Sequence, residues 1–124
     1  MIRIVVLMPN PQGFEAGDFL VFQIESGFGL LRILAIAEVD GDAVWHLTVY
    51  RELFPEIEYA ERAIASPETL TPEISHIALT DRAFESTQVS KLATGRLSEV
   101  EVARIDDWNG EISDRSIRLL LGLR

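Results

Sequence analysis

The chain contains no cysteine, and Lys91 is the single lysine among 11 basic residues. Without thiols the protein cannot form disulfides or thiolate metal sites, and this absence is most simply explained by a cytoplasmic setting. Basic residues are also scarce relative to the 20 acidic ones, so the formal net charge is −9. Such a chain would repel a phosphate backbone, and nucleic acid is therefore not an expected partner.

Long hydrophobic runs are missing as well. Every apolar segment is interrupted by charge or glycine well before the roughly 20 residues that a membrane span requires. The run at Ile4–Met8 is too short for the core of a signal peptide, and we interpret Ile2–Met8 as a first strand. The chain is nevertheless 48% hydrophobic over 124 residues. This composition predicts one domain, residues 1–124, with a sizeable buried core.

Motifs that carry chemistry are absent too. Gly27 and Gly29 are followed neither by a third glycine nor by a helix, so no nucleotide-binding loop is predicted. No serine lies in a G-x-S-x-G elbow. The two histidines, His46 and His76, belong to no H-x-H or H-E-x-x-H motif, and Asp40-Gly41-Asp42 lacks the later ligands of a calcium loop. We therefore predict no cofactor, no metal and no catalytic residue, which favours a non-enzymatic protein.

The clearest organisation lies between Ala16 and Tyr50. Three apolar segments are separated there by stretches rich in glycine and aspartate. Such stretches form tight turns because glycine tolerates positive φ. The pattern predicts a strongly bent antiparallel sheet, or an SH3-like partial barrel, in the N-terminal half. The three predicted strands are Phe19–Glu25, Leu30–Val39 and Ala43–Tyr50.

Alternation within Ala43–Tyr50 distinguishes its two faces. Trp45, Leu47 and Val49 are the better core face, which places His46 and Tyr50 together on a more polar face. After Tyr50 the periodicity becomes helical, so the predicted fold class is α+β, with two or three short helices packed against the sheet. The later predictions are a helix at Pro55–Ala65, a strand at Ile74–Leu79, helices at Asp81–Leu92 and Glu99–Trp108, and a closing segment at Ser113–Leu123 for which strand is favoured over helix.

Two local signals support these helices. Ser98 and Glu101 have the spacing of a capping box, in which each residue bonds the backbone N–H of the other. Acidic residues cluster before and within Pro55–Ala65, namely at Glu52, Glu56, Glu58 and Glu61. This cluster is either a solvated helix face or an acidic surface that docks a basic protein partner.

Two alternatives belong to other functional classes. His46, Tyr50 and His76 could converge in a pocket between the sheet and the helices, as in a small-molecule-binding or hydrolytic enzyme. The apolar tail Ile117–Leu123 could instead pair across a homo-oligomer, as in a structural subunit. Nothing in the sequence points to a membrane partner.

The N-terminal half resembles the bacterial immunity protein 26 family. The resemblance rests on Gly17-Asp18-Phe19 with the apolar strand that follows, on Gly29-Leu30-Leu31-Arg32-Ile33-Leu34, and on Val49-Tyr50. It covers roughly residues 16–50, and the second half has no counterpart in that family. The resemblance implies a protein that neutralises a toxin by binding it, and it transfers no active-site residue. A non-enzymatic protein-binding module is accordingly the favoured function.

Overall fold

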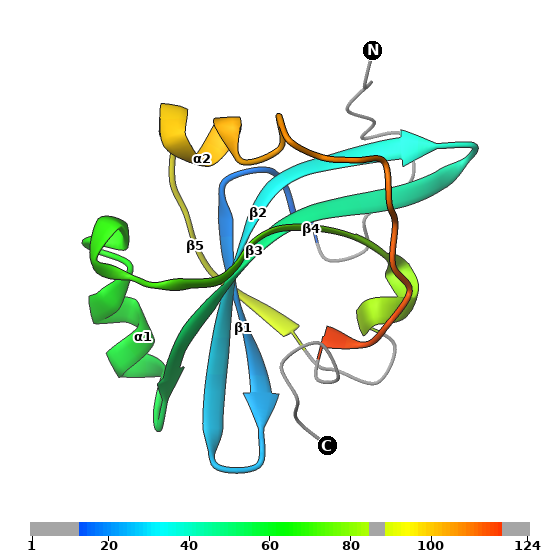
Figure 1. Cartoon of the computed structure of the whole chain (residues 1–124). Coiled ribbons are helices and arrows are strands. Elements are labelled where there is room, and N and C mark those ends of the chain that lie inside the picture. Colours follow the sequence, from blue (N-terminus) through cyan, green and yellow to red (C-terminus); the bar gives the residue numbers. More distant parts are fainter. Residues whose placement is uncertain (1–12, 85–88, 118–124) are drawn as a thin grey trace.

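A computed structural model of the chain describes residues 13–84 and 89–117 (Figure 1). Five antiparallel strands form one sheet in the order β4-β3-β2-β1-β5. Within these residues, two short α-helices, α1 and α2, and two single turns of 3-10 helix connect or flank the strands. The elements are β1 (Asp18–Ile24), β2 (Gly27–Val39), β3 (Asp42–Phe54), α1 (Ile57–Ala63), η1 (Pro67–Thr69), β4 (Pro72–Thr80), η2 (Asp81–Phe84), β5 (Val89–Thr94) and α2 (Glu99–Ala103).

The predicted turn between β2 and β3 is confirmed, whereas the first turn precedes the expected glycines, because Gly27 and Gly29 belong to β2. β1 and β2 pair up to Ile24 and Gly27, which leaves a two-residue turn between them. β2 and β3 are joined through Asp40 and Gly41, whose φ angles are 52° and 87°. Two consecutive positive φ angles are typical of the type I′ turn, whose twist matches that of the paired strands. The hairpin arms therefore follow from local sequence.

The sheet is bent along its long central strands (Figure 1). The pairing of β2 with β3 shifts register between Gly29 and Leu31 and again between Ile33 and Ala35. Such bulges increase the local twist and bend the strand that contains them. The result is an open antiparallel sheet with β4 and β5 at its edges. The α+β class is thus confirmed, whereas closure into an SH3-like barrel is not.

Gly29 is required by a close approach of an aromatic ring. It lies directly across from Phe22 in the pairing of β1 with β2. A Cβ at this position would be 2.1 Å from Phe22 Cζ, far inside van der Waals contact. A glycine in a strand often marks such an approach. The residue thus makes room for the Phe22 ring in the core, in addition to lying at a bulge.

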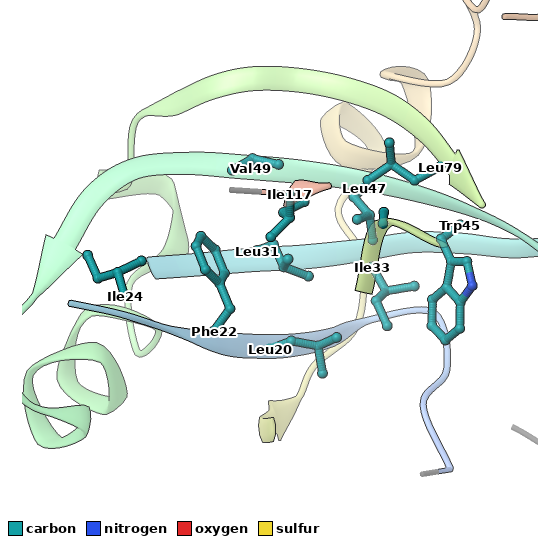
Figure 2. Packing of buried hydrophobic residues seen from close by; sticks show 11 residues of the cluster. Leu20, Phe22, Ile24, Leu31, Ile33, Trp45, Leu47, Val49, Leu79 and Ile117 are labelled. Atoms are coloured by element: carbon teal, nitrogen blue, oxygen red, sulfur yellow. The ribbon is translucent and has the colours of Figure 1, made fainter. Parts of the chain in front are cut away.

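One face of the sheet carries the larger hydrophobic core (Figure 2). Trp45, Leu47 and Val49 lie on this face, as their alternation predicts. Figure 2 shows them beside residues of β1 and β2 and beside Ile117, which comes from the C-terminal part of the chain. The buried members are Leu20, Phe22, Ile24, Leu31, Ile33, Trp45, Leu47, Val49, Leu79, Ala83 and Ile117.

The opposite face combines a smaller apolar cluster with buried polar groups. Near α1 the cluster consists of Phe19, Val21, Leu30, Tyr50, Ala60 and Leu70. Farther along the same strands the buried residues are Arg32, His46 and Thr48, which are at most 1% exposed. Both faces of the central strands are therefore covered. This explains why the sequence of β1 has apolar residues at both alternating sets of positions.

A buried carboxylate fastens the start of β1 to β5. Asp18 is fully buried, and its Oδ1 accepts a hydrogen bond from the Thr94 hydroxyl at 2.6 Å. Its Oδ2 accepts from the Glu15 backbone N–H and lies 3.3 Å from the Lys91 ammonium. The single lysine therefore supplies the counterion of a buried acid.

The prediction of a helix at Asp81–Leu92 is wrong. Asp81–Phe84 form one 3-10 turn, η2, and Val89–Thr94 form strand β5, which pairs with the outer edge of β1, so the described part of this segment contains no α-helix. Thr80 and Asp81 are good helix-start residues, but the backbone of Val89–Thr94 gains its hydrogen bonds from β1. Tertiary pairing has overridden local preference here.

The predicted helix at Pro55–Ala65 is confirmed as α1 with shorter ends, and the strand at Ile74–Leu79 is confirmed within β4. The helix predicted at Glu99–Trp108 is shorter than expected, because α2 ends at Ala103. Beyond it the backbone continues in turns with three-residue spacing as far as Trp108. Ile2–Met8 and residues 118–124 lie outside the described part of the chain. None of the described helices is long and apolar enough to cross a membrane.

Candidate functional sites

The acidic surface predicted from sequence is centred on α1. Ala60 is fully buried against the smaller apolar cluster, and Ala63 and Ile64 pack on the same cluster. This fixes the orientation of the short helix and leaves Glu56, Glu58 and Glu61 exposed. Three of the four predicted carboxylates therefore share one solvent-facing region.

Glu52 has a different role from these three. Its side chain is half-buried at the end of β3, and its Oε1 accepts a hydrogen bond from the Thr71 backbone N–H at 2.9 Å. Burial is the largest single influence and would raise the pKa of this carboxyl, but the hydrogen bonds from Thr71 and the nearby charge of Arg51 together outweigh it, so the pKa is lowered. Glu52 thus helps to hold the segment before β4 against β3.

An aromatic side chain accompanies the carboxylates of this region, since Tyr59 on α1 is 47% exposed. Leu53 in β3 is 52% exposed, but it faces away from α1, because the next residue, Phe54, packs against the cluster under the helix. Arg62 lies 4.7 Å above the Tyr59 ring, and among the described residues it forms no ion pair with Glu58. We call Glu56, Glu58, Tyr59 and Glu61 the α1 surface. It offers negative charge beside exposed apolar area.

The two histidines meet on neighbouring strands. His46 in β3 is opposite Ala78 in β4, and His76 lies two residues away along β4 on the same face. The distance from His46 Nδ1 to His76 Nε2 is 2.8 Å, and the two rings are nearly parallel. One of these nitrogens must be unprotonated for a hydrogen bond to form, since two N–H donors would oppose each other.

Burial makes the histidine pair strongly favour its neutral form. His46 is fully buried, and its Nε2 has no hydrogen-bond partner among the described residues. Burial, with a smaller contribution from the charge on His76, lowers the pKa of His46 to about 4. Burial likewise lowers the pKa of His76. The pair is therefore uncharged at neutral pH.

Trp108 packs against both histidines and fixes the segment after α2. Its ring is edge-on to His46 at 4.7 Å and to His76 at 6.3 Å between centroids. Its indole Nε1–H donates to the Glu111 carbonyl at 2.7 Å. The tryptophan thereby connects the histidine pair to the loop that follows it.

A pocket of about 740 Å³ opens beside this arrangement. β4 supplies His76 to one wall, and residues 107–114 form the other. The segment 107–114 is held to β4 by backbone hydrogen bonds between Ser113 and the strand residues Ala78 and Thr80. The lining groups with polar or aromatic side chains include Asp107, Trp108, Glu111 and Asp114. We call this the Trp108 pocket.

Tyr50 does not join the histidines. It lies four residues from His46 along β3, which separates the two backbone positions by roughly 13 Å. Burial raises the pKa of the Tyr50 hydroxyl, and the nearby Glu101 carboxylate acts in the same direction. Of the three residues predicted to share a pocket, the structure brings two together and places Tyr50 with a buried ionic cluster.

That ionic cluster was not predicted from sequence. Arg32 is 1% exposed, and its Nε lies 3.3 Å from Glu101 Oε2. Its Nη2 also donates to the carbonyl oxygens of Gly95 and Arg96, both at 3.1 Å. Desolvation lowers the pKa of the guanidinium, while the Glu101 charge opposes this shift. The available signal was a lone arginine inside a long apolar strand, which requires a partner once it is buried.

Glu101 serves two purposes in the cluster. Its Oε1 accepts from the Ser98 backbone N–H at 2.9 Å, while the Ser98 hydroxyl accepts from the Glu101 N–H at 3.2 Å. The predicted capping box is therefore confirmed. Its other oxygen, Oε2, faces Arg32, so the capping box at the start of α2 also supplies the carboxylate that neutralises a buried charge. At the end of α2, Arg104 makes a second polar contact with the sheet by donating to the Thr48 hydroxyl of β3 at 3.0 Å.

Comparison with known proteins does not extend these observations, because no family model, no curated protein and no solved structure matches the chain. Within residues 13–84 and 89–117, no group of three or more histidine, aspartate or glutamate side chains is arranged to hold a metal ion. Among the described residues, the two features suited to binding are the exposed acidic surface at α1 and the open Trp108 pocket.

Proposed function

We propose that the protein is a non-enzymatic binding module that docks a basic protein partner in the cytoplasm through the α1 surface. The observation that carries the proposal is the grouping of three exposed carboxylates, Glu56, Glu58 and Glu61, with the exposed ring of Tyr59 at α1. Negative charge steers a basic partner during encounter, and an exposed aromatic group supplies contact area once it has docked.

The resemblance of residues 16–50 to the immunity protein 26 family is compatible with this proposal. Proteins of that kind act by occupying a toxin, so their function needs a surface and no catalytic residues. In this proposal the partner is a toxin with a basic surface, and the bent sheet is the scaffold that presents α1.

The test is charge reversal on the α1 surface. The variant Glu56→Lys, Glu58→Lys and Glu61→Lys is compared with wild type as immobilised bait in the native lysate, and captured proteins are identified by mass spectrometry. We expect the wild type to retain a basic protein that the variant loses. With that protein purified, we expect association to slow by roughly tenfold at low salt and by less at high salt, since screening weakens steering.

A matched control separates a local effect from one of net charge. The variant Glu25→Lys, Asp42→Lys and Asp106→Lys reverses three exposed carboxylates outside α1. It should keep the partner and most of the association rate. If both triple variants lose the partner equally, or neither does, the α1 surface is not the docking site.

The two alternatives receive less support from the described residues. A hydrolytic enzyme needs a nucleophile paired with a base, but within the described residues the Ser113 hydroxyl in the Trp108 pocket bonds the Arg115 backbone N–H and no histidine. A tail that pairs two chains would need accessible apolar residues, but Ile117 is fully buried in the core of its own chain. Residues 118–124 lie outside the described part.

A further inference from the structure

We propose that the Trp108 pocket binds an organic cation, with the positive group of a guanidinium or primary amine held by the carboxylates of Asp107 and Glu111. This site uses none of the α1-surface residues, so the inference is independent of the proposed function. It rests on the composition of the pocket wall, on the neutrality of the histidines behind it and on the way the loop is fixed.

The charge of the wall has one sign. Asp107, Glu111 and Asp114 line the pocket, and neither lysine nor arginine is among its lining residues. Asp114 is partly neutralised, since its Oδ2 lies 3.9 Å from Arg82 Nη1 in an exposed pair. Within the described ranges Asp107 and Glu111 form no ion pair. A cation entering the pocket therefore meets two uncompensated carboxylates.

The base of the pocket does not repel a cation. His76 lines it, and His76 is hydrogen-bonded to the fully buried His46. Because a buried imidazole pair resists protonation, the histidines carry no positive charge at neutral pH. An anionic ligand would find no charged donor in this wall, which is why the pocket fits a cation and not a phosphate or carboxylate.

Aromatic and aliphatic groups suit the stem of such a ligand. Trp108 lines the pocket, and indole is the aromatic ring that attracts cations most strongly. Ile112 lines it as well and is 38% exposed, so methylene groups can pack against it. The bond from the Trp108 indole N–H to the Glu111 carbonyl keeps the ring and one carboxylate-bearing residue together before any ligand arrives.

The experiment follows the two indole N–H signals by NMR while a ligand is added to the full chain. The probe is N-acetyl-arginine methylamide, and the neutral control is N-acetyl-citrulline methylamide, which has the same shape without the charge. The chain has two tryptophans, and Trp45 donates to Asp81 Oδ1 on a different face of β3. Trp45 therefore reports general effects, while Trp108 reports the pocket.

We expect a saturable shift of the Trp108 signal, with Kd in the roughly millimolar range typical of one small group. The citrulline compound should bind at least about tenfold more weakly, and the Trp45 signal should stay in place. This comparison needs no variant, so it remains decisive even if substitutions in the loop impair folding. Equal shifts with both compounds, or a shift at neither, overturn the proposal.

Variants then locate the charge. The pair Asp107→Asn and Glu111→Gln should weaken binding by about tenfold, because each exposed carboxylate contributes roughly a two- to fivefold effect. The pair Glu58→Gln and Glu61→Gln removes the same charge from α1 and should leave Kd within about twofold. Equal weakening by both pairs of substitutions would mean that the net charge of the protein alone attracts the probe. That result would contradict a specific cation site at Asp107 and Glu111.

The source of the cation is decided by two further ligands. Agmatine represents a free small molecule, and a blocked Gly-Gly-Arg-Gly-Gly peptide represents an arginine side chain of a protein. If both shift Trp108 with similar Kd, the pocket accepts a protein side chain; if only agmatine does, it accepts a free amine or guanidine. If neither shifts Trp108, the proposal is wrong.

Discussion

The two helices are attached to the same face of the sheet by opposite means. α1 is held by apolar packing, with Ala60 fully buried and Ile64 partly so. α2 is held by polar contacts: Glu101 is its buried residue, while Val100 and Val102 are 69% and 52% exposed. Apolar packing tolerates small adjustments. Breaking a buried ion pair is strongly destabilising, because removing one partner leaves the other charge buried and unpaired. We therefore expect substitutions at the two attachments to behave differently.

The largest expected effect comes from leaving Arg32 without its carboxylate. Glu101→Ala removes the partner of a charge that is 1% exposed, and we expect a loss of about 3–5 kcal/mol in the free energy of unfolding. Urea denaturation followed by fluorescence measures it. The double variant Arg32→Met with Glu101→Gln should recover much of this loss, because no unpaired charge stays buried. If the double variant is as unstable as Glu101→Ala, the ion pair is not the cause.

The next effect concerns acidification at the histidine pair. The folded pKa of His46 is about 4, below its ordinary value of 6.5, so the unfolded chain binds the proton more readily. The free energy of unfolding is therefore unaffected by this group above about pH 6.5. As the pH falls toward 4, protonation of His46 in the unfolded chain lowers the free energy of unfolding by up to about 3 kcal/mol. Urea denaturation between pH 7.5 and 4.5 measures this loss.

His46→Gln provides the control for that profile, because the carboxylates of the protein titrate in both chains. Wild type should lose more stability than the variant over the same pH interval. If the two profiles are parallel, His46 is not the group that resists protonation.

A smaller effect is expected at the apolar attachment. Ala60→Leu adds volume to a fully buried position of α1 and should destabilise the protein by about 1–3 kcal/mol through overpacking. Glu61→Leu, one residue later and exposed, should change stability by less than about 0.5 kcal/mol. Thermal unfolding by circular dichroism compares the two. Equal shifts in Tm would contradict the assignment of Ala60 as the anchor.

The smallest effect separates the capping role of the α2 motif from its ionic role. Ser98→Ala removes one half of the capping box without touching Arg32, and we expect a loss of about 1 kcal/mol. Thermal unfolding measures this loss, and Ser66→Ala, at a helix start without a side-chain cap bond, is the matched control. A loss as large as that of Glu101→Ala would mean that capping, and not the ion pair, holds α2.

Sequence reasoning was sufficient wherever the determinants are local. The Asp40-Gly41 turn, the alternation at Trp45 and Leu47, and the amphipathic pattern of α1 each depend on a few neighbouring residues, and each is confirmed. β5 was misassigned because its backbone partner, β1, lies about 70 residues earlier in the sequence. No local sequence pattern predicts a pairing with so distant a strand.

The candidate sites show the same division. The exposure of Glu58 and Glu61 follows from helical periodicity, so it could be predicted, while Glu56 is exposed just before the helix begins. The contact between His46 and His76 depends on the register of β3 against β4, which contains two irregularities after Leu47. Arg32 and Glu101 lie far apart in the sequence. The lone arginine in an apolar strand therefore indicates that a partner exists, but no local pattern identifies which residue it is.

The contact between Lys91 and Asp18 has a consequence for covalent labelling. Apart from the chain's α-amino group, an amine-directed reagent has one ε-amine to modify, and that amine is 3.3 Å from a carboxylate that is completely shielded from solvent. Acylation would abolish the positive charge and leave the acid without a counterion where β1 meets β5. Fluorophores or surface-coupling chemistry aimed at lysine would thus loosen the edge of the sheet, and attachment through an introduced thiol preserves it.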